Sequence, residues 1–222
     1  ALLLHLLDDH LCDGQLRCAH ALLQLRTRAW SRFEAAITRL AEGLAGADAF
    51  VQARIERYFA AVERPREAIS LDAALARARG EMATWAVIPA LCAWRTEGAM
   101  ARDALVDALE RLFMAWRIVD DLDDLADDLR SGAANLVLCV LSPAGQAAWP
   151  GGRQNNDCID VDKRGQDAVA DICALALREG VASMLARRAH AELDQAARTA
   201  DAVGWPRLAA QFLALAQPLV GD

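Results

Sequence analysis

The sequence predicts an all-α protein, a single-domain antiparallel helix bundle around a central active-site cavity. Of its 222 residues, 55% are hydrophobic and 25% are charged, which is enough for one domain with a large core. Alanine, leucine and arginine dominate, and runs of β-branched residues are absent. Apolar residues recur at helical spacing along most of the chain, so we treat residues 1–222 as one helical domain.

The chain begins inside a helical pattern with no capping residue before it, so we expect that an N-terminal part of the fold is missing. Further helices are expected at about residues 16–44, 48–62, 71–93, 102–129, 134–141, 166–202 and 205–219. Ser70 is the expected N-cap of the 71–93 helix, which Gly80 and Pro89 interrupt, and Gly180 is an expected break in the 166–202 helix. The polar, glycine-rich stretch 149–165 is expected to be a loop.

An acidic run lies inside the apolar pattern of the 102–129 helix and holds six aspartates: Asp120, Asp121, Asp123, Asp124, Asp127 and Asp128. On a 3.6-residue period, Asp120, Asp124 and either Asp127 or Asp128 share one face. Carboxylates at this spacing suit Mg²⁺, a hard cation that prefers oxygen ligands. A solvated helix face is the ordinary alternative for such a run. The apolar residues before and within it instead predict that the acids line an interior cleft, where buried charge needs counter-cations.

A second acidic cluster follows the apolar start of the chain and contains Asp8, Asp9 and Asp13. Alone, it reads equally well as the end of a helix turning into solvent at Gly14. Together, the two clusters predict two sides of one metal site, with these ligands: Asp8, Asp9, Asp13, Asp120, Asp121, Asp124 and Asp128. Asp9 and Asp124 are the two that we expect to be essential for catalysis.

These residues carry a family resemblance. The stretch Asp8-Asp9-His10-Leu11-Cys12-Asp13 resembles the first aspartate-rich motif of class I isoprenoid (terpenoid) synthases, with one extra residue between its carboxylates. The run from Arg117 through Asp128 to Gly132 resembles their second motif. Bacterial class I terpene synthases and polyprenyl synthase-like enzymes are the most similar members. The resemblance implies two facing helices that bind three Mg²⁺ ions, which grip and help to expel the diphosphate of a prenyl substrate.

The resemblance also implies positive side chains for the diphosphate and an apolar wall for the prenyl chain. Arg77, Arg79 and Arg130 are the candidate diphosphate ligands, because guanidinium groups bind phosphate oxygens bidentately. Arg77 and Arg79 are two positions apart on a helix, so only one of them can face the cavity. The candidate wall residues are Phe59, Trp85, Phe113 and Trp116, whose aromatic faces can stabilise a carbocation. A surface arginine and an ordinary core aromatic are the corresponding alternatives.

The first functional hypothesis is a Mg²⁺-dependent terpene synthase that ionises a C15 or C20 prenyl diphosphate to form a hydrocarbon or alcohol. The alternative is a prenyltransferase, either a trans-polyprenyl diphosphate synthase or a squalene/phytoene synthase-like enzyme. Lys163 is the only lysine, and no arginine pair follows the first motif, which favours one diphosphate over two. A non-catalytic helical partner subunit is the third hypothesis.

Composition excludes several other classes. The net charge of −7 disfavours nucleic-acid binding, and no apolar stretch reaches the ~18 to 20 residues of a membrane span. Six cysteines without a Cys-x-x-Cys pair predict buried, reduced thiols and a cytoplasmic protein. A homodimer is left open.

Overall fold

The structure, a computed structural model, describes residues 2–12, 16–63, 70–149 and 163–220. Within these ranges the chain forms eleven α-helices and two short 3-10 helices, and no strand occurs, which confirms the predicted all-α bundle. The α-helices are α1 (Leu2–Cys12), α2 (His20–Ala41), α3 (Ala47–Val62), α4 (Leu71–Glu81), α5 (Val87–Glu97), α6 (Ala99–Asp123), α7 (Leu125–Ser131), α8 (Pro143–Ala148), α9 (Lys163–Arg178), α10 (Val181–Ala202) and α11 (Pro206–Ala216). The 3-10 helices are η1 (Leu136–Cys139) and η3 (Gln217–Val220).

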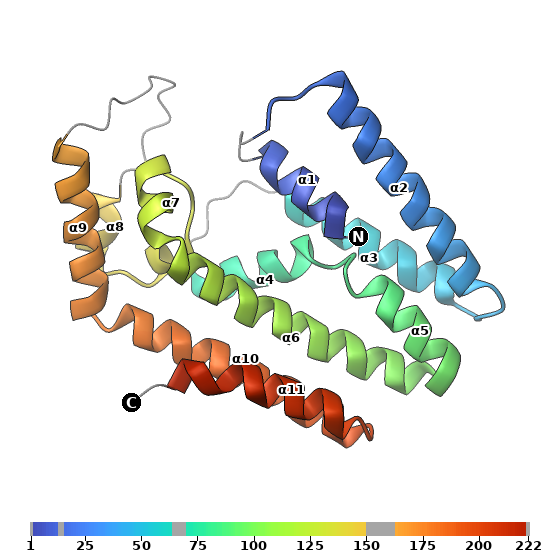
Figure 1. Cartoon of the computed structure of the whole chain (residues 1–222). Helices are drawn as coiled ribbons and strands as arrows, with labels where there is room; N and C mark the ends of the chain where they lie inside the picture. The colour runs from blue at the N-terminus through green and yellow to red at the C-terminus, as the bar shows by residue number, and fades with distance from the viewer. Residues whose placement is uncertain (1, 13–15, 64–69, 150–162, 221–222) are drawn as a thin grey trace.

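The long helix α6 runs through the middle of the molecule, with α10 and α11 on one side and α1, α2, α3 and α5 on the other (Figure 1). The largest apolar core includes Ile118 of α6, Leu185 of α10 and Phe212 of α11, all buried. A second core joins α2, α3 and α5 through residues such as Phe33 and Leu91. The acidic end of α6 points toward α7, α8 and α9 at one end of the bundle.

Several helix boundaries follow the local signals in the sequence. Ser70 caps α4, because its hydroxyl oxygen accepts a hydrogen bond from the backbone N–H of Ala73 at 3.2 Å. Gly180 separates α9 from α10 with φ of 68°, a left-handed conformation that glycine adopts without steric cost. The predicted N-cap at Ser70 and the predicted break at Gly180 are thus confirmed.

Other boundaries differ from the prediction. The 71–93 region has one interruption, at residues 82–86, because Pro89 lies in the first turn of α5, where its missing N–H costs nothing. The expected 134–141 helix is only the four-residue η1, which Asn135 caps. Most of the expected 149–165 loop lies outside the described residues, and Lys163 already begins α9.

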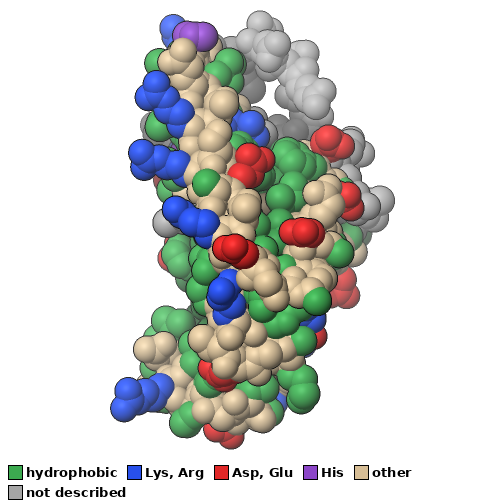
Figure 2. Space-filling model, turned by 90° about the vertical axis from the view of Figure 1, so that its right-hand side faces the viewer, with side chains coloured by type: hydrophobic (Ala, Val, Ile, Leu, Met, Phe, Trp, Pro, Cys, Tyr) green, Lys and Arg blue, Asp and Glu red, His purple; other side chains and the backbone are tan. Residues whose placement is uncertain are grey.

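The helix α2 carries a strong positive charge in an acidic protein. Its residues 20–41 include four arginines and one glutamate, whereas the whole chain has a net charge of −7. Arg28, Arg32 and Arg39 are exposed, and Figure 2 shows Lys and Arg side chains in a row along one edge of the face that carries α2. These three arginines lie on the surface of the protein, unlike the buried ion pairs described below.

The cysteines only partly match their prediction. Cys18, Cys92, Cys139 and Cys173 are free thiols, but Cys18 and Cys92 are exposed rather than buried. The side chain of Cys12 and the whole of Cys158 lie outside the described residues. Across the described helices, none is both long and apolar enough to cross a membrane.

Candidate active site at the junction of α6 and α7

The acidic run spans a break between two helices. The helix α6 ends at Asp123 and α7 begins at Leu125, so Asp124 lies between them with φ of −88° and ψ of 2°. The expectation of one continuous helix through Leu129, with a straight ladder of carboxylates, is therefore wrong. Like charges at i, i+4 spacing weaken a helix at this point, and a tertiary hydrogen bond described next completes the break.

The side chain of Asn135 hydrogen-bonds to residues on both sides of this break. Its Nδ2 group donates to the backbone carbonyl of Asp121 at 2.6 Å, and also to Oδ2 of Asp128 at 2.7 Å. In a continuous helix, the carbonyl of Asp121 would accept a hydrogen bond from the backbone N–H four residues later. The Oδ1 atom of Asn135 in turn accepts from the N–H of Val137 at 2.9 Å. Sequence reasoning missed Asn135, although an Asn just before an apolar segment is an N-cap signal.

The six aspartates around the break differ in how exposed their side chains are to solvent. Asp121 is buried and Asp128 is half-buried, whereas the remaining four are exposed: Asp120, Asp123, Asp124 and Asp127. The prediction of an interior cleft thus holds for Asp121 and partly for Asp128, and it is wrong for the other four. The reason is geometric, since the apolar faces of α6 and α7 are buried against other helices and most of the acids occupy the faces that remain.

Asp121 is 2% exposed and is held on both oxygens. Its Oδ1 is 2.8 Å from Nε of Arg117, and its Oδ2 accepts from the backbone N–H of Leu136 at 2.6 Å. Burial raises the pKa of Asp121 to about 7, an effect that Arg117 and the Leu136 N–H oppose and that Asp128 and Asp120 reinforce. At neutral pH this carboxyl group is therefore close to its midpoint of ionisation.

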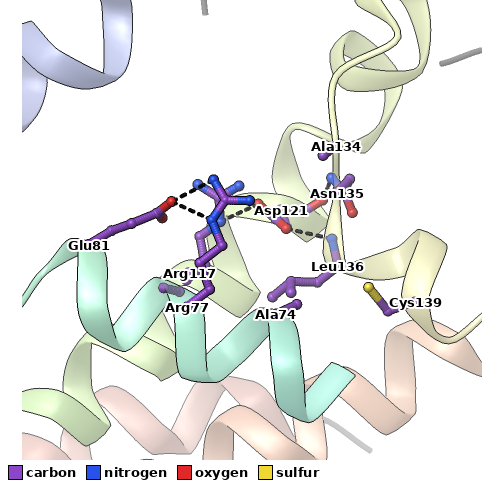
Figure 3. A pocket seen from close by; sticks show the side chains of 10 residues that line it. Ala74, Arg77, Glu81, Arg117, Asp121, Ala134, Asn135, Leu136 and Cys139 are labelled. Carbon is purple, nitrogen blue, oxygen red and sulfur yellow. Dashed lines mark hydrogen bonds and ion pairs between the residues drawn. The ribbon is translucent and has the colours of Figure 1, made fainter. Parts of the chain in front are cut away.

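A small cavity of about 70 Å³ opens beside Asp121 (Figure 3). Two oppositely charged pairs line it, Arg77 with Glu81 from α4 and Arg117 with Asp121 from α6. The Arg77–Glu81 pair is separated by 2.8 Å. The space is large enough for several waters or one phosphate group, and it is too small for a whole prenyl diphosphate.

The structure separates the three candidate diphosphate arginines. Arg77 lines the cavity, whereas Arg79 points to the far side of α4, toward Glu110 and Met114 of α6. The sequence-based statement that only one of the two can face the cavity is confirmed, and that one is Arg77. Arg130 is exposed and pairs with Asp127.

The first acidic cluster has a different character. Asp8 is buried on α1, where Nη2 of Arg26 donates to its Oδ2 at 2.9 Å and Nε donates to its Oδ1. The hydroxyl of Tyr58 on α3 also donates to Oδ2. These three donors occupy most of the acceptor sites of the Asp8 carboxylate, which leaves little of it for a metal ion. The side chain of Asp9 and the whole of Asp13 lie outside the described residues.

The four aromatic candidates lie in three different environments. Trp85 and Phe113 form an edge-to-face pair with ring centroids 5.2 Å apart. Phe59 stacks on Trp30 with centroids 5.7 Å apart, close to Asp8. Trp116 is 58% exposed and lies on the surface of α6.

Trp116 belongs to an apolar groove of about 470 Å³ between α6, α10 and the C-terminal helices. Asp120 and Asp123 line the groove together with apolar residues that include Leu193 and Leu215. Positions 116, 120 and 123 share one face of α6, whereas position 121 faces the small polar cavity. The acidic run therefore separates a polar cavity from an apolar groove.

Comparisons of this chain with models of protein families, with curated proteins and with solved structures find no match.

Proposed function

We propose that this protein is a Mg²⁺-dependent class I terpene synthase that ionises a C15 or C20 prenyl diphosphate. One observation carries the proposal. Arg77, which the sequence singles out 40 residues or more before the acidic run, lines the same cavity as Arg117 and Asp121. A polar cavity with two guanidinium groups, next to a cluster of carboxylates, suits a diphosphate that is bound partly through metal ions.

The carboxylates at the junction suit Mg²⁺ in one binding mode only. Among the described residues, no three Asp, Glu, His or Cys side chains are arranged to enclose a metal ion. Mg²⁺ commonly takes one or two protein carboxylates and completes its shell with water and substrate phosphates. Asp124 is exposed at the helix break and Asp120 is exposed one turn earlier, so both fit this mode. Bound there, Mg²⁺ would supply Lewis-acid stabilisation of the departing diphosphate.

The protein's own side chains then have distinct roles. Arg77 and Arg117 donate hydrogen bonds to diphosphate oxygens and balance the charge that grows as the C–O bond breaks. Asp121 positions Arg117 through the 2.8 Å contact between them. Arg77 exchanges Glu81 for the substrate, since its ion pair lies at the cavity wall.

The prenyl chain needs an apolar, water-poor surface, because water would capture the carbocation early. The groove beside Trp116 has the volume and the lining of a small-molecule site. The Trp85–Phe113 pair offers a second aromatic surface, in which Phe113 is buried, unlike Trp116. Trp116→Ala and Phe113→Leu, each assayed for product pattern, distinguish the two surfaces, because only residues that touch the cation change the ratio of products.

The direct test incubates the protein with Mg²⁺ and C10, C15 or C20 prenyl diphosphate, with and without isopentenyl diphosphate. We expect diphosphate release and a hydrocarbon or alcohol from a single C15 or C20 substrate. Arg77→Gln is expected to reduce diphosphate release by about 100-fold, while Arg28→Gln on the outer face of α2 leaves it unchanged. Longer prenyl diphosphates that appear only with isopentenyl diphosphate would instead identify a prenyltransferase. No turnover and no Mg²⁺-dependent diphosphate binding would leave a non-catalytic partner subunit.

A further inference from the structure

Three arginines converge on a single buried glutamate between α3, α4 and α6. Glu110 is 8% exposed, and its Oε1 accepts from Nη1 of Arg54 and, at 2.9 Å, from Nη1 of Arg57. Its Oε2 is 3.5 Å from Nε of Arg79. In the part of the chain that the structure describes, Glu110 is the only carboxylate within ion-pair distance of these three arginines. We call this group the Glu110 cluster.

Close packing of two helices holds the cluster together. A Cβ atom added to Gly80 of α4 would lie 2.7 Å from the Cβ of Ala61 on α3. Only glycine permits this approach, which packs the part of α4 that carries Arg79 against the part of α3 that carries Arg57. The arginines are therefore brought together by the backbone of α3 and α4 rather than by flexible side chains reaching from a distance.

The Glu110 cluster has an excess of positive charge. Guanidinium groups stay protonated at any physiological pH, so three of them beside one carboxylate leave two positive charges uncompensated. Among the described residues, the buried Nε atom of Arg79 makes no hydrogen bond, and its nearest carboxylate oxygen, Oε2 of Glu110, is 3.5 Å away. Buried donors and charges without partners are costly, so a cluster of this kind is incomplete without an anion.

The other buried glutamate provides an internal comparison. Glu192 of α10 pairs with Arg111 and Arg188, and here the positive charge is more than compensated by carboxylates. Asp107 accepts from Arg111 at 3.0 Å, and Asp72 lies 3.5 Å from Arg188. Two arginines thus meet three carboxylates around Glu192, whereas three arginines meet one carboxylate around Glu110. The excess charge is specific to the Glu110 cluster.

An anion can reach the cluster from solvent. The side chains of Arg57 and Arg79 are 37% and 33% exposed, while Glu110 lies beneath them. A dianion would bring the net charge of the cluster to zero. Arginine forks match the oxygens of a phosphate group in particular, with charge-assisted hydrogen bonds.

We propose that the Glu110 cluster is a binding site for a dianionic phosphate group, formed by Arg54, Arg57 and Arg79. The site lies about 16 Å along α6 from Asp121, because 11 residues separate positions 110 and 121 at ~1.5 Å each. It is distinct from the cavity of the proposed active site and does not depend on the proposed function. Free phosphate and a phosphomonoester present the same terminal group, so both are candidate ligands.

The test measures anion binding without Mg²⁺ or prenyl substrate. The melting temperature of the protein is followed in inorganic phosphate, phenyl phosphate or chloride at equal ionic strength and about pH 8, where phosphate is largely dianionic. Isothermal titration gives the dissociation constants. We expect either phosphate to raise the melting temperature above its value in chloride, and Arg57→Gln to weaken phosphate binding about tenfold. The control is Arg28→Gln, which removes an exposed arginine elsewhere and is expected to leave binding unchanged.

A second variant separates a binding site from a purely structural ion cluster. Glu110→Gln removes the only negative charge, so it is expected to lower the melting temperature in chloride and to bind phosphate more tightly. Phosphate should then restore most of the lost melting temperature. Equal responses to phosphate and chloride in the unmodified protein, or equal loss of binding in Arg57→Gln and Arg28→Gln, would overturn the proposal. Because no catalytic step enters, failure here leaves the proposed function standing, and the reverse also holds.

Discussion

Among the described side chains, each of the two acidic regions buries one aspartate, Asp8 or Asp121, and the two carboxylates are neutralised in different ways. On α1, both oxygens of Asp8 are used by the fork of Arg26, and the hydroxyl of Tyr58 adds a third donor. On α6, Arg117 contacts only one oxygen of Asp121, the other accepts from a backbone N–H, and burial raises the pKa of the carboxyl to about 7.

The surroundings of the two aspartates differ even more. Asp8 is enclosed by the helices that pack on α1, whereas Asp121 faces a cavity and has exposed carboxylates on either side of it in the chain. From the sequence motifs alone, both clusters are expected to contribute ligands equally to one metal site. The structure assigns Asp8 to a closed, hydrogen-bonded network, whereas the α6–α7 junction has solvent-exposed carboxylates, as far as the described side chains of the two regions go.

The largest expected effect tests the open region. Asp124→Ala should reduce Mg²⁺-dependent diphosphate release by at least about 100-fold, because it removes an exposed carboxylate that we propose as a Mg²⁺ ligand. Stability should change by less than about 0.5 kcal/mol, since Asp124 is exposed and its side chain makes no capping hydrogen bond to α7. Steady-state kinetics and urea unfolding measure the two quantities. Asp201→Ala, an exposed aspartate on α10, is the matched control. Full activity in Asp124→Ala would break the comparison.

The closed region should respond in the opposite manner. Arg26→Ala leaves the buried carboxylate of Asp8 without its main partner, and we expect a loss of about 2–3 kcal/mol in the free energy of unfolding. The figure lies below that for a fully buried pair because the Arg26 side chain is about one-third exposed and water screens it. Urea unfolding followed by circular dichroism measures the change. A cost below about 0.5 kcal/mol would show that this network is not what holds α1 in place.

The smallest effect, counted per pH unit, concerns the protonation of Asp121. Its pKa is about 7 in the folded protein and near 3.8 in the unfolded chain, so between these values only the folded state keeps the proton. This group therefore favours folding fully below about pH 4, and that contribution is lost as pH rises toward 7. The free energy of unfolding of the unmodified protein should fall relative to Asp121→Asn, by at most about 1.4 kcal/mol per pH unit. Parallel curves from pH 4 to pH 8 would contradict the raised pKa.

Much of the fold could be predicted from local signals, because those signals act within one or two helical turns. Ser70 and Gly180 mark helix boundaries through capping and backbone conformation. The break at Asp124 was missed because it depends on Asn135, a residue that reaches back from another segment. Local propensity contains no information about such a tertiary competitor for a backbone carbonyl.

The candidate site shows the same division. Helical geometry established that only one of Arg77 and Arg79 could face the cavity, but choosing Arg77 required knowing which helices pack on each side of α4. The Glu110 cluster could not be predicted from the sequence for a similar reason, since more than 50 residues separate Arg54 and Arg57 from Glu110 along the chain. Charge pairing at that separation follows from packing alone.

The amide of Asn135 has a consequence for how this end of the molecule opens. One side chain is bonded at once to the end of α6, to Asp128 of α7 and to the start of η1. These segments cannot separate one at a time, because releasing any of them leaves a buried amide or carbonyl without a partner. We therefore expect α7 and η1 to behave in hydrogen exchange as one foldon, with amides that open in a single event although a turn lies between them in the chain.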